Sequence, residues 1–454
     1  MAWRPPSTIV ALSTPRGYGG LAVIRLSGPD ARSITKKIFR SRQPLSHRKA
    51  VIGELIDRNG FIDTAISTFF AAPDSYTGED LVEISLHGNP YLCDLVIDAC
   101  NEFGAHLAGP GEFTQRAFLN GKMDLSQAEG VADLIYSSSR AAQKISANLL
   151  KGSFGREIKR LKSQLVEALS IIELEMDFMD EEIDHTPLEK LQNKIAAIIK
   201  KTDGLIKSYE VGKILREGIF CPIIGPPNSG KSSLFNAFLQ EERVIVSPRP
   251  GTTRDYIEEV VRIGNYQIRF MDTAGLRKST DEIESRGIQK TRVLMLSANT
   301  ILYVIDSSKP LKGLPDLPSH LLKKTLFILN KSDLTDSKNL RRLNEIFGKY
   351  PHLSCSALKN EGVHRIAKTI IEQLEAKIHN FGDTHIISRQ RHKNALISTK
   401  KFLKLAWRNL HNKSAPEIIA IDLREALGGL DIILGKTENE DILNHIFSHF
   451  CIGK

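Results

Sequence analysis

The spacing of apolar residues changes several times along the chain. In residues 1–120, the runs at 21–28 and 65–70 are short and apolar, and residues 81–88 alternate apolar with polar positions, as strands do. Residues 91–105 have helical spacing instead. One apolar face of that helix is formed by Leu92, Leu95, Val96, Ala99 and Phe103. Residues 1–120 are therefore predicted to form an α+β domain.

Residues 121–215 show no strand pattern and repeat apolar positions at helical spacing. The same pattern runs from residue 380 to the end and begins with the basic stretch 389–410. Because these two helical segments flank a pattern of another kind, we expect 121–215 and 380–454 to be two halves of one all-helical domain, with a second domain inserted between them.

The inserted segment, residues 216–379, alternates apolar strands with helices. This order predicts a mostly parallel, doubly wound sheet with helices on both faces. Two of its runs, 256–263 and 266–272, are separated only by Gly264-Asn265. They are predicted to form an antiparallel hairpin at one edge of the sheet.

Composition narrows the class of protein without identifying it. Hydrophobic residues make up 41% and charged residues 25% of the 454 residues, which excludes wholesale disorder. The formal net charge of +9 favours a nucleic-acid partner only slightly. No stretch approaches the roughly 18 continuous apolar residues of a membrane span, and the five cysteines contain no CxxC pair. We expect a cytoplasmic protein without a membrane segment, disulfide scaffold or zinc knuckle.

Residues 225–232 read GPPNSGKS and match the GxxxxGK[ST] phosphate-binding motif, between a predicted strand and a predicted helix. The backbone N–H groups of such a loop and the helix N-terminus bind phosphates, Lys231 reaches the β- and γ-phosphate oxygens, and the Ser232 hydroxyl ligates Mg²⁺. The expected nucleotide-binding positions are Asn228, Ser229, Gly230, Lys231, Ser232 and Ser233.

Two further segments offer groups for Mg²⁺ and the γ-phosphate. Asp272-Thr273-Ala274-Gly275 ends a predicted strand, so that its carboxylate holds Mg²⁺ through water and the Gly275 N–H meets the γ-phosphate. Thr252-Thr253 precedes it and supplies a second Mg²⁺ ligand, for which Thr253 is preferred.

The remaining motifs indicate which base is bound. Asn330-Lys331-Ser332-Asp333 follows an apolar strand, and its aspartate accepts two hydrogen bonds from the N1–H and amine of guanine. Adenine lacks that donor pair and leaves the carboxylate unpaired. Ser356-Ala357-Leu358 resembles the last guanine-contacting loop. The inserted domain is therefore predicted to bind GTP.

The residue after this DTAG motif is Leu276, where many GTP-hydrolysing switches have a glutamine that orients the attacking water. A leucine cannot hydrogen-bond water. Either another group takes this role, with Asp281, Glu282 and Glu284 as candidates, or the domain binds GTP without hydrolysing it well. The residues alone leave both readings open.

Distinctive motifs occur along the whole length of the chain. They are STPRGYGGLAVIRLSG, YTGEDLVEISLHG and PGEFTQRAFLNGKMDLSQAEGVADLI near the start, GPPNSGKSSLFNAF, GTTRD, DTAGLR and NKSD in the middle, and IFSHFCIGK at the end. In these motifs the chain resembles a known family, the bacterial tRNA modification GTPase MnmE (TrmE) family. Other GTPases lack the first and last sets, so the match is specific.

The resemblance implies an N-terminal folate-binding domain like that of aminomethyltransferases, which also forms a homodimer. Members act with the flavoprotein MnmG, in a heterotetramer, to install a carboxymethylaminomethyl or aminomethyl group at C5 of the wobble uridine of certain tRNAs. A 5-formyltetrahydrofolate-type cofactor is implied, with contacts carried over to Arg25, Glu83, Lys122 and Lys454. Considered singly, each of these residues is better explained by a surface salt bridge than by a folate contact.

The resemblance also implies potassium-dependent hydrolysis, in which K⁺ neutralises charge between the phosphates. The K⁺ ligands implied are Asn228 and the carbonyls of Ser247, Pro248, Arg249, Pro250, Gly251 and Thr252. Glu284 matches the family's catalytic glutamate, which orients the attacking water. Arg249 and the prolines depart from the usual loop, and a guanidinium beside the cation site would weaken K⁺ binding. Cys451 and His87 are interpreted as structural.

Two other functions remain as alternatives. The first is an RNA-binding ribosome-assembly or checkpoint GTPase, although residues 380–454 contain no GXXG loop of a KH domain. The second makes folate chemistry primary and GTP only a regulator. GTP turnover per modified tRNA separates the second from the favoured reading.

Overall fold

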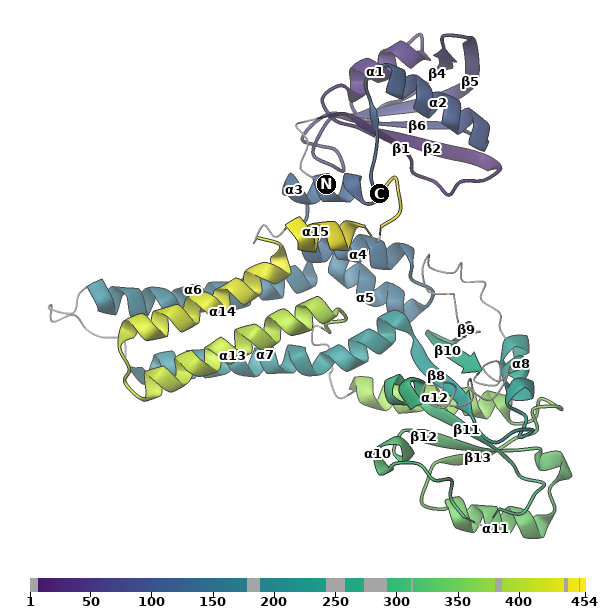
Figure 1. The fold of residues 1–454 in the computed structure, drawn as a ribbon. Helices are drawn as coiled ribbons and strands as arrows, with labels where there is room; N and C mark the ends of the chain where they lie inside the picture. The colour runs from purple at the N-terminus through teal and green to yellow at the C-terminus, as the bar shows by residue number, and fades with distance from the viewer. Residues whose placement is uncertain are drawn as a thin grey trace, which may run out of the picture. The chain divides into compact units, whose positions relative to one another are not determined.

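The computed structural model describes residues 7–177, 188–241, 258–272, 292–311, 313–379, 386–436, 440–448 and 450–454 (Figure 1). The chain divides into two compact units. The first unit consists of Met1–Ala132, Leu149–Lys159 and Leu430–Lys454, and the second of Asp133–Asn148 and Arg160–Gly429. Each unit thus combines segments that are distant in the sequence.

The first unit contains a seven-stranded sheet in the order β3-β4-β5-β6-β2-β1-β7. Its strands are β1 (Ile9–Leu12), β2 (Gly19–Ser27), β3 (Phe39–Arg40), β4 (Ala50–Asp57), β5 (Gly60–Phe70), β6 (Leu81–Gly88) and β7 (His106–Leu107). Neighbours are antiparallel except β1 and β7. Buried and less buried positions alternate along β5, as in a sheet with one face on a core.

Two helices, α1 (Ala31–Ile38) and α2 (Pro90–Glu102), pack against this sheet. The apolar face expected for α2 is partly wrong. Its fully buried residues are Cys93, Val96, Ala99 and Cys100. Phe103 is 41% exposed because the helix ends one residue earlier, and the Lys37 ammonium lies 4.9 Å from the centre of its ring. The two small thiols, rather than the larger Leu92 and Leu95, fit closest to the sheet.

The C-terminus of the chain lies beside β1 in the same unit. Pro110 and Ile452 form an isolated β-bridge, and Ser13 Oγ donates a hydrogen bond to the Gly453 carbonyl at 3.0 Å. A Cβ atom on Gly453 would lie 2.3 Å from the Leu12 carbonyl oxygen, and its φ is +91°. Only glycine allows this approach.

The remaining helices of the first unit are α3 (Glu112–Leu119), most of α4 (Leu125–Ile135), the beginning of α6 (Ser153–Asp177), the end of α14 (Pro416–Leu434) and α15 (Glu440–Phe447). Leu125 and Ala128 of α4 share a buried cluster with Phe447 and Phe450. This cluster joins residues near the start of the chain to its last helix.

The second unit contains a six-stranded sheet in the order β13-β12-β11-β8-β10-β9. Its strands are β8 (Ile219–Ile224), β9 (Glu258–Ile263), β10 (Tyr266–Asp272), β11 (Ile301–Asp306), β12 (Thr325–Asn330) and β13 (His352–Ser354). All neighbours are parallel except β9 and β10, an antiparallel hairpin at one edge. The predicted parallel sheet and edge hairpin are confirmed.

Helices cover both faces of this sheet (Figure 1). They are α8 (Lys231–Glu241), a helical segment at 292–297, α10 (Ser319–Leu322), α11 (Ser337–Phe347) and α12 (Val363–His379), with a 3₁₀ turn at Ser332–Leu334. Ile328 of β12 packs in a core with Phe238 of α8. Phe327, the residue before it, packs on the other side with Phe347 of α11.

The helical part of the second unit comprises α5 (Arg140–Leu150), most of α6, α7 (Leu188–Glu217), α13 (Gln390–His411) and most of α14. α7 and α13 contact each other, with Lys393 Nζ 3.0 Å from Glu210 Oε1 and Lys400 paired with Asp203. Among the described residues, no helix has the length and apolar character needed to cross a membrane.

Candidate functional sites

The phosphate-binding motif lies between the parallel strand β8 and α8, as expected. A Cβ atom on Gly225 would lie 2.2 Å from the Val304 carbonyl oxygen, so glycine lets the loop begin against β11. Asn228 and Gly230 also have positive φ values, +60° and +92°. The loop therefore turns tightly and ends on the N-terminus of α8, where backbone N–H groups attract anions.

Two polar side chains are buried in this loop. Lys231 is 8% exposed, and its Nζ donates to the Pro226 carbonyl at 2.7 Å, which directs the ammonium back over the loop. Within the described residues, the buried Ser229 Oγ has no hydrogen-bond partner. A buried cation and a spare hydroxyl donor fit a phosphate group. Ser232 and Ser233, in the first turn of α8, are exposed.

The base-reading motif is joined to this loop through Asn330, the last residue of β12. Its Nδ2 donates to the Ser229 carbonyl at 2.9 Å, and its Oδ1 accepts from the Ala357 N–H at 3.0 Å. Asn330 and Ser356 are both buried, whereas Leu358 is 86% exposed. One side chain thus holds together the expected phosphate loop, the NKSD motif and the SAL motif.

Lys331 makes a second bridge between the motifs. It has a positive φ of +64°, and its Nζ donates to the Asn228 carbonyl at 2.8 Å and to Asp306 Oδ2 at 2.7 Å. Burial acts to raise the pKa of Asp306, but hydrogen bonds from Lys331 and Ser308 outweigh it and hold the pKa below its usual value. Sequence reasoning missed Asp306. Its position could have been noticed in the sequence, because Asp306 is the last residue of β11 and ligands bind at the carboxyl ends of the strands in such sheets.

Asp333 is prepared to act as an anion. A hydrogen bond from Ser356 is the main cause that lowers the pKa of its carboxyl, and Lys359 Nζ lies 3.8 Å from its Oδ2. An ionised carboxylate is the acceptor that a guanine N1–H and amine require. Lys331 immediately precedes the 3₁₀ turn Ser332–Leu334, so Asn330 to Asp333 lie together at the carboxyl end of β12.

Several expected site residues fall outside the described residues. These are Ser247, Pro248, Arg249, Pro250, Gly251, Thr252, Thr253, Thr273, Ala274, Gly275 and Glu284. The backbone of Asp272 is described, and it pairs in register with Ile223, just before the phosphate loop. The strand that carries Asp272 therefore ends beside that loop.

A second polar cluster lies in the first unit. Arg25 and Glu83 are directly opposite on β2 and β6, with Arg25 Nη2 2.6 Å from Glu83 Oε1. The guanidinium also lies 5.4 Å from the centre of the Tyr76 ring and 5.7 Å from that of Phe113. The Arg25 side chain is only 13% exposed, so this is a sheltered pair rather than a surface salt bridge.

Of the other two residues expected to bind folate, Lys454 is close to this pair. Burial, with Arg25 as a nearby cation, lowers the pKa of Lys454, while Glu83 opposes the shift. Lys122 has different contacts, because its Nζ donates to the Pro73 carbonyl at 2.9 Å. Its side chain lies along the turn at Gly78, in the same turn that carries Tyr76.

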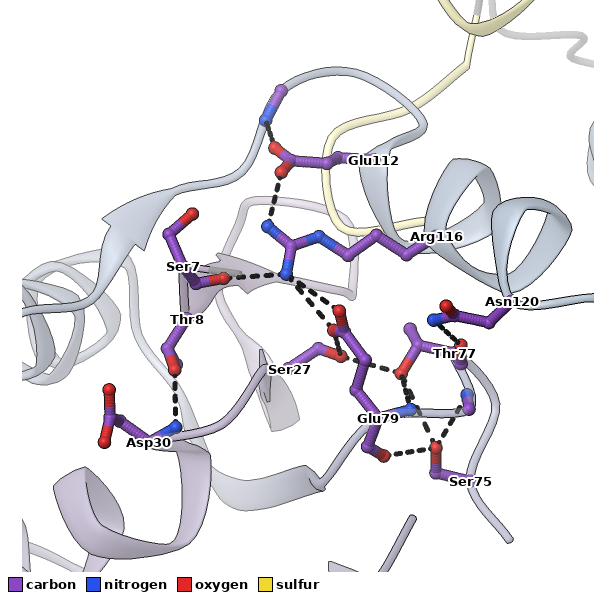
Figure 2. A network of polar contacts seen from close by, with 12 residues as sticks. Ser7, Thr8, Ser27, Asp30, Ser75, Thr77, Glu79, Glu112, Arg116 and Asn120 are labelled. Carbon is purple, nitrogen blue, oxygen red and sulfur yellow. Dashed lines mark hydrogen bonds and ion pairs between the residues drawn. The ribbon is translucent and has the colours of Figure 1, made fainter. Parts of the chain in front are cut away.

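That turn is held by a network around Arg116 of α3 (Figure 2). Arg116 Nη1 donates to the Ser7 carbonyl at 2.7 Å and to Glu79 Oε2 at 3.1 Å, and its Nη2 donates to Glu112 Oε1 at 2.8 Å. Glu79 accepts in turn from Ser27 Oγ at 2.8 Å. Sequence reasoning assigned no role to any of these residues. Glu112 and Arg116 are one helical turn apart, but Ser7, Ser27 and Glu79 are distant from them in the sequence.

His87 and Cys451, which the sequence analysis interprets as structural, both have exposed side chains. His87 Nδ1 lies 2.8 Å from Asp63 Oδ1, and the His87 N–H donates to Asp63 Oδ2. Burial acts to raise the pKa of Asp63, but these bonds outweigh it and lower the pKa. Cys451 is exposed, and its carbonyl accepts a hydrogen bond from the Gly111 N–H at 3.3 Å.

The parallel α/β sheet and the strand–loop–helix phosphate motif define the class of P-loop nucleotide-binding proteins. The NKSD motif at the end of β12 is the one expected for a GTP-binding member. The comparisons with known proteins narrow this class. Residues 8–122 match the family model for the GTP-binding protein TrmE N-terminus, and residues 125–451 match that for the MnmE helical domain.

Curated relatives match along the whole chain. The tRNA modification GTPase MnmE of Natranaerobius thermophilus is 40% identical over 454 residues, covering 98% of this chain and 99% of the relative. That of Aquifex aeolicus is 38% identical over 450 residues, with 98% and 99% covered. The chain belongs to the tRNA modification GTPase MnmE family, and it is an enzyme, a GTP hydrolase in tRNA modification.

Solved structures add little to this assignment. The G domain of the T. maritima FeoB iron transporter is 25% identical and covers 34% of this chain and 97% of its own, with a TM-score of 0.26. So low a score carries no argument about this chain.

Proposed function

We propose that this chain couples GTP hydrolysis to modification of the wobble uridine of tRNA. Together with the flavoprotein MnmG, it would install a carboxymethylaminomethyl or aminomethyl group at C5, with a folate as one-carbon donor. GTP binding is supported above all by the hydrogen bond from Asn330 Nδ2 to the Ser229 carbonyl. This bond holds the NKSD motif, which contains Asp333, against the phosphate loop. The tRNA part is supported by the family.

In this proposal the phosphates are held by Lys231 and by the N–H groups at the start of α8. Asp333 reads guanine as an ionised carboxylate, and the hydrogen bond from Ser356 that lowers its pKa also orients it. Ser232, Thr253 and Asp272 would hold Mg²⁺, which when bound supplies positive charge to the phosphate oxygens. Among the described residues the buried hydroxyl of Ser229 has no partner, which fits an anionic ligand better than a purely structural loop.

Hydrolysis needs a group that orients water, because Leu276 cannot. We assign this to Glu284. Asn228 and the carbonyls of residues 247–252 would hold K⁺, which supplies charge neutralisation like that of an arginine finger. Asn228 already has a constrained backbone at φ +60°, and its carbonyl is held by Lys331.

The folate would bind at the cluster of Arg25, Glu83 and Lys454 in the first unit. Carboxylate and guanidinium together fit a pterin, which presents N–H donors beside a carbonyl, and cations fit the glutamate tail. Lys122 uses one of its three N–H donors on the Pro73 carbonyl, which leaves two for the cofactor. A homodimer formed by the N-terminal domain belongs to the same proposal.

The hydrolysis step is tested by measuring GTP turnover in KCl and in NaCl at equal ionic strength. We expect strong stimulation by potassium and its loss in Glu284→Ala, with Glu282→Ala as the matched control. Equal rates in the two salts would exclude the cation step. Loss of activity in both variants would remove the special role of Glu284.

The modification step is tested by reconstitution with MnmG and tRNA, followed by mass spectrometry of the wobble nucleoside. Modification should require GTP and folate together, with GTP consumed for every uridine modified. Glu83→Gln should abolish modification even when folate is present, while leaving GTP hydrolysis by the chain alone intact. Modification without GTP consumption would favour GTP as a regulator only.

A further inference from the structure

The helices α7 and α13 are rich in positive charge, and none of these cations belongs to the nucleotide-binding motifs. Together they contain thirteen Lys and Arg residues and four Asp and Glu residues, a formal net charge of +9. This equals the net charge of the full chain, so all other residues together sum to zero. α13 alone contributes six of these cations and no acidic residue.

The two sides of α13 differ sharply. Its buried residues recur every three or four positions and are His392, Ala395, Leu396, Thr399, Leu403, Ala406 and Leu410. Lys401, Lys404 and Arg408 recur at the same spacing on the opposite side and are exposed. We call these three residues the α13 basic face. At a rise of about 1.5 Å per residue, the face extends roughly 10 Å along the helix.

The nearby carboxylates of α7 are already neutralised by other lysines. Asp203 is shared between Lys207, at 2.7 Å, and Lys400, so that this group keeps a net positive charge. Glu210 pairs with Lys393, whose ammonium also lies 4.3 Å from the centre of the Tyr209 ring. In the part of the chain that the structure describes, no carboxylate pairs with a member of the α13 basic face.

An aromatic side chain lies next to these cations. Trp407 is 39% exposed, and its ring stacks on that of His411 with centroids 5.6 Å apart and an angle of 5° between the planes. A partly exposed indole beside cations is what an unpaired base and its phosphate would contact. An acidic protein surface would use the cations but would have no need of a flat ring.

We propose that the α13 basic face binds the phosphate backbone of tRNA, with Trp407 stacking on an unpaired base. The inference rests on tRNA being the substrate, as proposed above, and adds the surface that holds it. Phosphates of one nucleic-acid strand follow one another at about 3.4 Å along the helix axis, so a 10 Å stripe can meet roughly three of them. Charge complementarity is the reason for choosing this surface.

The test uses the full-length protein and a fluorescent, unmodified tRNA transcript. Binding is measured by anisotropy over a range of salt concentrations. The test variant is Lys401→Glu/Lys404→Glu/Arg408→Glu. The control is Lys338→Glu/Arg341→Glu/Arg342→Glu, which makes the same charge change at three exposed positions of α11. GTP hydrolysis by each variant reports whether it is folded.

We expect the α13 variant to bind tRNA at least tenfold more weakly. Its plot of log affinity against log salt should be shallower by about two, because three phosphate contacts are lost. The α11 control should stay within about twofold of wild type. Equal weakening in both variants would mean general charge attraction, and an unchanged α13 variant would mean that tRNA binds elsewhere. Either result overturns the inference.

Trp407→Ala tests the stacking part separately. It should weaken binding of tRNA several-fold but leave binding of a fully paired RNA duplex unchanged. Equal loss for both RNAs would show that the indole only supports α13. If wild-type protein bound no tRNA, alone or with MnmG, the inference would fail. The proposed function would be contradicted only if the reconstituted reaction produced no modified uridine.

Discussion

Asn330 Nδ2 lies 2.9 Å from the carbonyl oxygen of Ser229, a residue 101 positions earlier in the chain. Asn330 is 2% exposed and also accepts from the Ala357 N–H. Asn330→Ala should leave both backbone groups without a partner, and each costs about 1–3 kcal/mol when buried. We expect lower stability and at least tenfold weaker GTP binding, measured by calorimetric titration. Asn330→Asp keeps an acceptor for Ala357 but places a buried carboxylate oxygen against the Ser229 carbonyl oxygen, so it should lose at least as much.

Gly225 tests how closely the phosphate loop must approach β11. In Gly225→Ala the new methyl group would lie 2.2 Å from the Val304 carbonyl oxygen, at a φ of +145° that L residues rarely adopt. Backbone cannot move aside cheaply, so we expect loss of about 3 kcal/mol or more and no measurable GTP binding. Gly264→Ala is the control, since its Cβ meets nothing within 4 Å and its φ is +59°. A Gly225→Ala protein that binds GTP normally would contradict the geometry.

Arg116 tests the network around the turn at Tyr76. Arg116→Ala would leave Glu79 and Glu112 without their cation in a sheltered place, at a cost of about 3 kcal/mol. We expect a lower midpoint of urea unfolding for the first unit and a weaker affinity for folate. Arg116→Lys keeps the charge but cannot reach all three acceptors, so its effect should be intermediate. Normal folate binding in a destabilised Arg116→Ala protein would show that the network supports the fold of the first unit but not the folate site.

Asp203 gives a pH dependence with a defined sign. Hydrogen bonds from Lys207 and Lys400 lower its pKa from 3.8 to about 2. Because the folded pKa is depressed, this stabilisation is present above pH ~4 and is lost as the pH falls towards 2. The Asp203 side chain is 26% exposed and Lys207 is largely exposed, so solvent screens the pair and its worth is about 1 kcal/mol. Asp203→Asn should unfold more easily than wild type at pH 6 and equally at pH 2, measured by urea unfolding. A difference independent of pH would assign it to packing instead.

The cysteines should differ in reactivity. Cys93, Cys100, Cys221 and Cys355 are buried, and burial raises the pKa of each, to about 12 for Cys100 and Cys355. Only the exposed Cys451 should react quickly with a thiol reagent in the native protein. Titration with a chromogenic disulfide should therefore report one thiol when folded and five in denaturant. Fast reaction of a second thiol would show that a buried core opens.

Local patterns predicted the second unit well. The strand–loop–helix around 225–232, the parallel strands and the edge hairpin follow from apolar period, glycine placement and a two-residue turn, all of which act within a few residues. The packing face of α2 was harder to predict. Helical spacing placed Phe103 on it, but the helix ends at Glu102 and the sheet accepts the small thiols of Cys93 and Cys100. The shape of the sheet surface that faces α2 decides which of its apolar residues become buried.

The sequence by itself determined the family, the order of the GTP motifs and the alternation of strands with helices, because motif spacing and periodicity are properties of the chain alone. Only the tertiary structure decided that Asn330 holds Ser229, that Arg25 pairs with Glu83 near Lys454, and that Asp306 receives Lys331. It also decided which lysines of α7 and α13 are neutralised and which remain exposed. These outcomes depend on contacts between residues distant in sequence, whose partners are chosen when the sheets and helices pack.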